Sequence, residues 1–198
     1  MRCVFYILLI LRSSIYTYAQ SQPGPPPYKP KGGVDENCIY RNKYTETERL
    51  KFYPFNVSDT IKLISFRYHN NNYPINKDHI TIDSLVEEKT LSKEEVARLT
   101  DILYNNVPRR PGNIHAILEC FEPRNAVLFI DKSGKLKEYM LICFHCRRFE
   151  SSSSEKFGEW DICNQKSEMI RKFFVSAGMK FGTDLSISEY PGECDDCF

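Results

Sequence analysis

The sequence predicts an α+β domain with a mainly antiparallel sheet of about five strands and two helices, after a signal peptide and a Pro-rich tether. Strand-like runs and helical segments follow one another in the order strand, strand, helix, three strands, helix. Aromatic residues are abundant and Gly is scarce, as is typical of a packed globular domain. With 198 residues in total, the chain is long enough for one domain and hardly for two.

The N-terminus has the three parts of a secretory signal peptide. Met1-Arg2 supplies a positive start, and Cys3–Leu11 is an apolar run too short to span a bilayer. Thr17-Tyr18-Ala19 then places small residues before a cut at Gln20. We therefore expect residues 1–19 to be removed during export to the periplasm or the extracellular space. No other apolar run is long enough to cross a membrane, so the mature chain is not expected to span one.

The remaining residues divide into three parts by composition. Residues 20–33 form a Pro/Gly-rich tether, residues 34–185 the α+β domain, and residues 186–198 a polar tail with a C-x-x-C motif. The net charge is +1, and basic residues are mixed with acidic ones along the chain. Because no basic stripe is present that would follow a phosphate backbone, nucleic acid is not an expected partner.

The clearest helix is predicted within Leu91–Val107. Ser92 and Glu95 match a capping box, and Asn105-Asn106 ends the helical pattern. Its apolar stripe consists of Val96, Leu99, Ile102 and Leu103.

A second helix is predicted from Asp161, a good N-cap residue, to Gly178, a good C′ residue. Cys163 falls in its first turn. Helical spacing places Cys163, Ile170 and Phe174 on one side, so we expect Cys163 to face the core.

Five runs are typical of strands, namely Ile61–Tyr68, His79–Val86, Ile114–Phe121, Ala126–Ile130 and Leu136–Cys146. Ile61–Tyr68 has apolar residues on both faces, and Ala126–Ile130 is apolar throughout, so both are expected to be buried. The polar turn Asp131–Lys135 joins Ala126–Ile130 to Leu136–Cys146 in a hairpin. Arg147–Glu150 is expected to prolong the return strand.

The mature chain is expected to keep an odd number of cysteines, which are Cys38, Cys120, Cys143, Cys146, Cys163, Cys194 and Cys197. Export to an oxidising compartment favours disulfides. Since the number is odd, at least one thiol is free, pairs between molecules or binds something else.

The main candidate site is a cluster of four cysteines at strand ends and at the start of the last helix: Cys120, Cys143, Cys146 and Cys163. The favoured interpretation is two disulfides that staple helix to sheet, with no cofactor. One alternative is a structural zinc site, in which Cys143 and Cys146 bind the metal with the other two thiolates of the cluster, and His145 is a substitute ligand. Another is redox catalysis through Cys143 and Cys146, although active C-x-x-C motifs normally open a helix.

A second C-x-x-C motif, Cys194-Asp195-Asp196-Cys197, lies in the polar tail. Its two carboxylates disfavour a thiolate, so a local disulfide or a loose metal-binding tail is expected instead of a catalytic thiol. If both C-x-x-C pairs close on themselves or within the core, Cys38 is the odd thiol and a candidate for an intermolecular bond.

Several motifs within Leu91–Thr183 occur together: Cys120 with Pro123–Ala126, the turn Asp131–Lys135, Ile142-Cys143-Phe144-x-Cys146, and Cys163 before Phe173-Phe174. With these motifs, about half of the chain resembles a family of small, uncharacterised exported proteins of Bacteroidota. The resemblance implies an envelope or extracellular location. It also groups four of the cysteines, and it implies no particular activity.

No recognisable catalytic set is present, since the sequence has no H-E-x-x-H, no G-x-S-x-G and no phosphate-binding Gly loop. We therefore expect an exported, non-enzymatic envelope or secreted binding protein that is braced by disulfides. The identity of its protein partner and its oligomeric state are left open. The rival hypothesis is a thiol-redox or zinc-dependent protein centred on Cys143 and Cys146.

Overall fold

The structure is a computed structural model, and it describes residues 38–68, 75–76, 79–80, 84–109, 121–153 and 163–185. The chain consists of two units with a sequence boundary between Gly32 and Gly33, and all described residues belong to the second unit. The expected signal peptide, tether and C-terminal tail lie outside the described residues. The same holds for the expected strand Ile114–Phe121 and for Cys120, Cys194 and Cys197.

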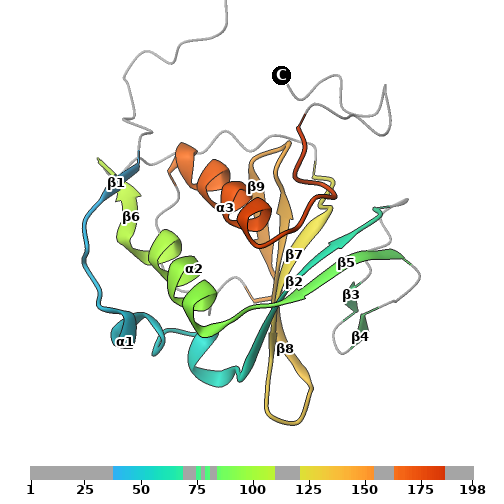
Figure 1. Ribbon diagram of the computed structural model, residues 1–198, viewed down its shortest axis with the longest axis horizontal. Helices are drawn as coiled ribbons and strands as arrows, with labels where there is room; N and C mark the ends of the chain where they lie inside the picture. The colour runs from blue at the N-terminus through green and yellow to red at the C-terminus, as the bar shows by residue number, and fades with distance from the viewer. Residues whose placement is uncertain are drawn as a thin grey trace, which may run out of the picture. The chain divides into compact units, whose positions relative to one another are not determined.

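A five-stranded antiparallel sheet forms the centre of the fold, in the order β5-β2-β7-β8-β9 (Figure 1). Its strands are β2 (Thr60–Phe66), β5 (Leu85–Thr90), β7 (Asn125–Ile130), β8 (Leu136–Cys143) and β9 (Arg148–Ser151). Every neighbouring pair runs antiparallel. The predicted α+β class with a mainly antiparallel sheet is therefore confirmed.

The central strand β7 and its neighbour β2 are buried on both faces. Leu63 pairs with Val127, and both side chains belong to the core cluster that the helices also join. The next pair, Ile64 and Ala126, belongs to a separate cluster on the opposite face. Because side chains alternate along a strand, this is the result expected from runs that are apolar on both faces.

Two helices, α2 (Lys93–Asn105) and α3 (Asn164–Ser176), cover one face of the sheet (Figure 1). The predicted capping box of α2 is confirmed. The backbone N–H of Glu95 donates to Ser92 Oγ at 3.2 Å, and the N–H of Ser92 donates to Glu95 Oε2 at 2.7 Å. The residues that the two helices bury in the shared core are Leu99, Leu103, Tyr104, Ile170, Phe173 and Phe174.

The predicted end of α3 is confirmed. Gly178 has a left-handed φ of +94°. Its N–H donates to Val175 O at 3.0 Å, and the N–H of Met179 donates to Phe174 O at 3.0 Å. These are the two hydrogen bonds of a Schellman motif, which needs a residue that adopts positive φ easily.

The start of α3 differs from the prediction, because the N-cap is Cys163 and not Asp161. Cys163 has extended backbone, with φ −123° and ψ 150°. Its expected burial is confirmed, and Ile170 and Phe174 on the same side of the helix are also buried. The helix therefore presents the predicted apolar side to the sheet.

The remaining elements are short. β1 (Cys38–Tyr40) pairs with β6 (Asn106–Pro108), and β3 (Ile75–Asn76) pairs with β4 (His79–Ile80). A helix that was not predicted, α1 (Glu46–Arg49), and a 3-10 turn, η1 (Phe55–Val57), lie between β1 and β2 in the chain.

The strand predicted at His79–Val86 is found only in part. Its first two residues form β4, and the strand that joins the main sheet is β5, which starts at Leu85 and continues to Thr90. β5 alternates between half-buried and exposed residues, with Glu87 on the half-buried side. This is the pattern of an edge strand. Its charged residues do not give the apolar alternation that predicts a strand, so the sequence pattern missed most of it.

The predicted extent of the last strand is wrong. β8 ends at Cys143 and not at Cys146, and the chain then turns and returns as β9 instead of prolonging the strand. Arg147, in the turn, has a left-handed φ of +51°. The C-x-x-C motif therefore lies in a hairpin turn.

The segment after α3 is fixed to β5 and β7 by hydrogen bonds. The Glu87 carboxylate accepts the N–H groups of Lys180 at 3.0 Å and Phe181 at 2.9 Å. Asn125 Nδ2 donates to Phe181 O at 3.0 Å. A Cβ atom added to Gly182, which has a φ of +71°, would lie 2.5 Å from Asn125 Oδ1. Any other residue at this position would have to displace the side chains of Asn125 and Arg124.

We expect Gly182→Ala to lower the free energy of unfolding by about 2–4 kcal/mol, since it adds both a close contact and backbone strain. Gly178→Ala is the matched control, because its φ is also positive but no atom lies within 4 Å of the added Cβ. That control should cost about 1 kcal/mol. Urea denaturation of both variants measures the difference, and equal losses would show that the contact with Asn125 is unimportant.

Candidate functional site

Cys143 and Cys146 are joined by a disulfide in the turn between β8 and β9. Each residue is only 2% exposed. The backbone N–H of Cys146 donates to Cys143 Sγ at 3.1 Å. His145, which lies between them in the sequence, is exposed. The motif therefore forms a closed local loop with buried sulfur atoms.

Cys38, which the sequence left as a possible free thiol, is bonded to Cys163. The Cα atoms of the two residues are 5.3 Å apart, although the residues are 125 positions apart in the sequence. β1 pairs with β6, which directly follows α2, and β1 also contacts α3. This long-range pairing brings Cys38 beside the N-cap of α3.

The predicted cluster of four cysteines is not joined in the way that was favoured. Cys163 staples α3 to β1 instead of to the central sheet, Cys143 pairs with Cys146, and Cys120 lies outside the described residues. In the described parts of the chain, no group of three or more His, Cys, Asp or Glu residues is arranged to hold a metal ion. The zinc alternative at Cys143, His145 and Cys146 requires reduced sulfur atoms and stays a prediction.

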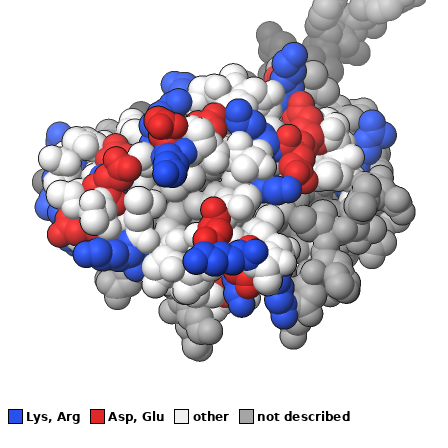
Figure 2. All heavy atoms as spheres, turned by 60° about the horizontal axis from the view of Figure 1, so that its bottom comes forward, with Lys and Arg blue, Asp and Glu red and all other residues white. Residues whose placement is uncertain are grey.

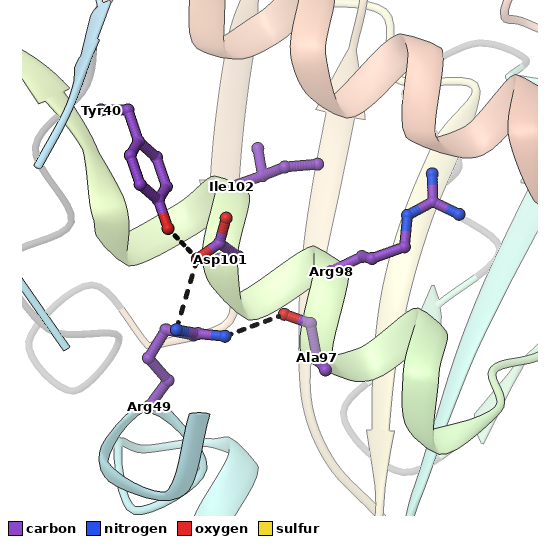
Figure 3. A pocket seen from close by; sticks show the side chains of 6 residues that line it. All are labelled: Tyr40, Arg49, Ala97, Arg98, Asp101 and Ile102. Atoms are coloured by element: carbon purple, nitrogen blue, oxygen red, sulfur yellow. Dashed lines mark hydrogen bonds and ion pairs between the residues drawn. The ribbon is translucent and has the colours of Figure 1, made fainter. Parts of the chain in front are cut away.

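A surface cleft of about 490 Å³ lies where β1 and α1 meet α2 (Figure 3). The residues that line it are Tyr40 from β1, Arg49 from α1, and Ala97, Arg98, Asp101 and Ile102 from α2. Figure 3 shows the side chains of Tyr40 and Arg49 converging on Asp101, whereas Arg98 extends away from them.

Arg49 is a buried cation, and its side chain is only 8% exposed. Its Nη1 lies 3.3 Å from Asp101 Oδ1 and donates to Tyr44 O at 2.7 Å. Nε donates to Thr100 Oγ1 at 3.2 Å, and Nη2 donates to Ala97 O at 3.4 Å. A buried charge is stable only with such compensation, so these contacts fix α1 against α2.

Two other charged groups of the cleft are closer to the surface. Asp101 Oδ1 also accepts hydrogen bonds from Asn105 Nδ2 at 2.7 Å and from the Tyr40 hydroxyl at 3.4 Å. Its second oxygen, Oδ2, has no partner among the described residues. Arg98 is exposed and donates to Ser176 Oγ at 3.0 Å. No carboxylate of the described residues pairs with Arg98.

A second polar cluster surrounds Glu138 on β8. Glu138 is buried, and its carboxylate accepts hydrogen bonds from the hydroxyl groups of Tyr53 and Ser152. Burial, and then the contact with Glu138, raises the pKa of the Tyr53 hydroxyl, which therefore stays protonated and donating. Ser152 also bonds backbone groups of Tyr139. We interpret this cluster as a structural tie between β8, the end of β9 and the loop before η1.

The face in Figure 2 carries mixed charges, with Lys and Arg beside Asp and Glu and no extended area of one sign. None of the described helices is both long and apolar enough to cross a membrane. No family model matches the chain, and no similar protein was found among the curated proteins or the solved structures.

The cleft was not predicted from the sequence. A signal for part of it was present, because Thr45 and Glu48 have the spacing of a capping box, and the structure shows this box at the start of α1. The pairing of Arg49 with Asp101 has no local signal, because the two residues lie on different helices.

Removal of the Cys38–Cys163 disulfide by alanine at both positions should cost more stability than the same change at Cys143 and Cys146. In the chain-entropy model the cost grows with the enclosed loop, and the sequence separations are 125 and 3 residues. The expected losses are about 5 and about 2 kcal/mol. Guanidinium denaturation of both double variants measures them. A larger loss for the short loop would contradict the entropic explanation.

Arg49→Met should lower the free energy of unfolding by about 3 kcal/mol, because it removes the buried guanidinium that hydrogen-bonds Tyr44 O, Thr100 Oγ1 and Ala97 O and pairs with Asp101. Arg67→Met is the control, since Arg67 is exposed after β2 and forms no ion pair with the described residues. The control should change stability by less than about 0.5 kcal/mol. Thermal and urea denaturation compare the two. If both variants are equally stable, the Arg49 contacts do not hold α1 in place.

Proposed function

We propose that the chain is an exported, non-enzymatic protein that binds a protein partner through a disulfide-braced α+β domain. The observation that carries the proposal is that four cysteines pair in two disulfides, Cys38–Cys163 and Cys143–Cys146. Structural disulfides persist in oxidising spaces such as the periplasm and the extracellular medium. The predicted signal peptide and the resemblance to exported proteins of Bacteroidota support the same location.

The burial of the C-x-x-C motif favours a structural role over catalysis. Thiol–disulfide exchange requires a thiolate to reach a sulfur atom of the disulfide. Cys143 and Cys146 are each 2% exposed, so a protein substrate has little access to them. The motif also lies in a hairpin turn and not at the start of a helix, where backbone N–H groups lower a thiol pKa.

One contact favours the alternative of thiol-redox or zinc chemistry at this motif. The N–H of Cys146 donates to Cys143 Sγ at 3.1 Å, and after reduction the same N–H would stabilise a thiolate there. The exposed His145 would then be a further proton donor or metal ligand. This alternative requires the disulfide to be reduced in the working protein.

The proposal is tested on the full chain, exported from a bacterial host and alkylated without reduction. We expect the intact mass of a chain that begins at Gln20, with no alkylation of Cys38, Cys143, Cys146 or Cys163. A native mass spectrum should show no bound metal. Because the sulfur atoms are joined, these sites should take up the label only after reduction in denaturant. We also expect one partner protein to copurify in stoichiometric amount from the envelope fraction of the native host.

Catalysis is tested separately with an insulin reduction assay. The proposal predicts no acceleration by the wild-type chain. Activity that disappears in Cys143→Ser but remains in Cys38→Ser would overturn the non-enzymatic assignment. Four free thiols together with one zinc ion would replace the disulfide-braced protein by the zinc alternative, and a chain retained in the cytoplasm would contradict export.

A further inference from the structure

The cleft on α2 combines apolar surface with an aromatic wall. Ala97 and Ile102 are half-buried, and Tyr40 is 58% exposed. Residues three and four positions apart on a helix lie on the same side, so Ala97, Arg98, Asp101 and Ile102 form one continuous strip. Figure 3 shows the Tyr40 ring, from β1, beside this strip.

The cleft also has one cation in excess. Arg49 and Asp101 neutralise each other at 3.3 Å. Arg98 contacts two uncharged groups, Ser176 Oγ at 3.0 Å and the Phe173 ring, whose centroid lies 5.5 Å from the guanidinium. A guanidinium without a carboxylate partner is suited to bidentate binding of a carboxylate. The charge of the cleft therefore favours an anionic ligand.

We propose that this cleft binds an acidic peptide segment of a protein partner. A carboxylate side chain of the segment pairs with Arg98, and a neighbouring apolar side chain packs against Tyr40 and Ile102. Asp101 Oδ2, to which none of the described groups donates a hydrogen bond, accepts an N–H of the peptide backbone. This inference rests on the proposed binding function and specifies the chemistry of the partner.

The open shape of the cleft favours a segment of a larger chain over a small molecule. Small-molecule sites typically bury about 70–90% of the ligand surface. Here the aromatic wall is itself 58% exposed, so a ligand in the cleft keeps one side in solvent. A volume of about 490 Å³ holds the side chains of a few residues. The remaining contacts of a protein partner would lie outside it.

The test uses the full chain with its disulfides intact and a random heptapeptide library displayed on phage. We expect enriched peptides to carry Asp or Glu beside an aromatic or large aliphatic residue. Arg98→Ala and Tyr40→Ala should each lower the affinity for the synthesised peptides about tenfold, as expected from the loss of a charge-assisted hydrogen bond or an aromatic contact. Replacement of the peptide carboxylate by its amide should not weaken binding to the Arg98→Ala variant any further, because both changes remove the same contact.

Arg67→Ala is the control, since it removes an exposed arginine outside the cleft and should leave affinity unchanged. Arg98 and Tyr40 are exposed, so their variants should keep the wild-type melting temperature. Enriched peptides without an acidic residue, peptides insensitive to both cleft variants, or no enrichment would each overturn the cleft assignment. Phenylacetate binding as tightly as the peptides would also overturn it, in favour of a small carboxylate. In all these cases the copurified partner still decides the proposed function independently.

Discussion

The pairing of β2 with β7 is the constraint on which the rest of the structure depends. The two strands pair continuously from Thr60 and Ile130 to Ser65 and Asn125, and most of their side chains are buried on both faces. A strand pair that is apolar on both sides must be covered on both sides. The helices cover one face, and the cluster on the opposite face includes Ile75 from β3. At the polar end of the pair, Asn125 Nδ2 donates to Ser65 Oγ at 2.9 Å, whereas Asn125 Oδ1 is buried without a hydrogen-bond partner among the described residues.

Apolar burial holds the helices against the sheet but does not fix their positions along it, because hydrophobic attraction is not directional. Directional contacts do this. Lys166 on α3 is fully buried, and its Nζ donates to Leu103 O at 2.7 Å. That carbonyl lies in the last turn of α2, where the helix dipole favours a cation. Arg49 fixes α1 to α2, and Cys38–Cys163 fixes β1 to α3. Two buried basic side chains and one covalent bond therefore set the geometry of this layer.

Local signals predicted local structure well. The capping box at Ser92 and the turn at Asp131 involve groups within a few residues of each other, and Asp131 Oδ1 accepts the N–H of Ser133 at 2.9 Å. The hydrogen bond from the Ser133 hydroxyl also lowers the pKa of Asp131, so its carboxylate stays charged and keeps accepting the hydrogen bonds of the turn. β5 was misplaced because an edge strand tolerates charged residues. The pairing of Cys38 with Cys163 and of Arg49 with Asp101 depends on how distant elements pack, so no sequence spacing revealed either one.

The long-range disulfide and the cleft are parts of one arrangement. Tyr40, the aromatic wall of the cleft, is only two residues from Cys38 in β1. The disulfide holds one end of this three-residue strand at the start of α3, and the N–H of Arg41 donates to Asn105 O at 2.8 Å just beyond its other end. A strand this short forms few backbone hydrogen bonds with β6, so covalent anchoring contributes much to its position. The same bond that braces the fold therefore also fixes the backbone of β1, which carries Tyr40 beside α2.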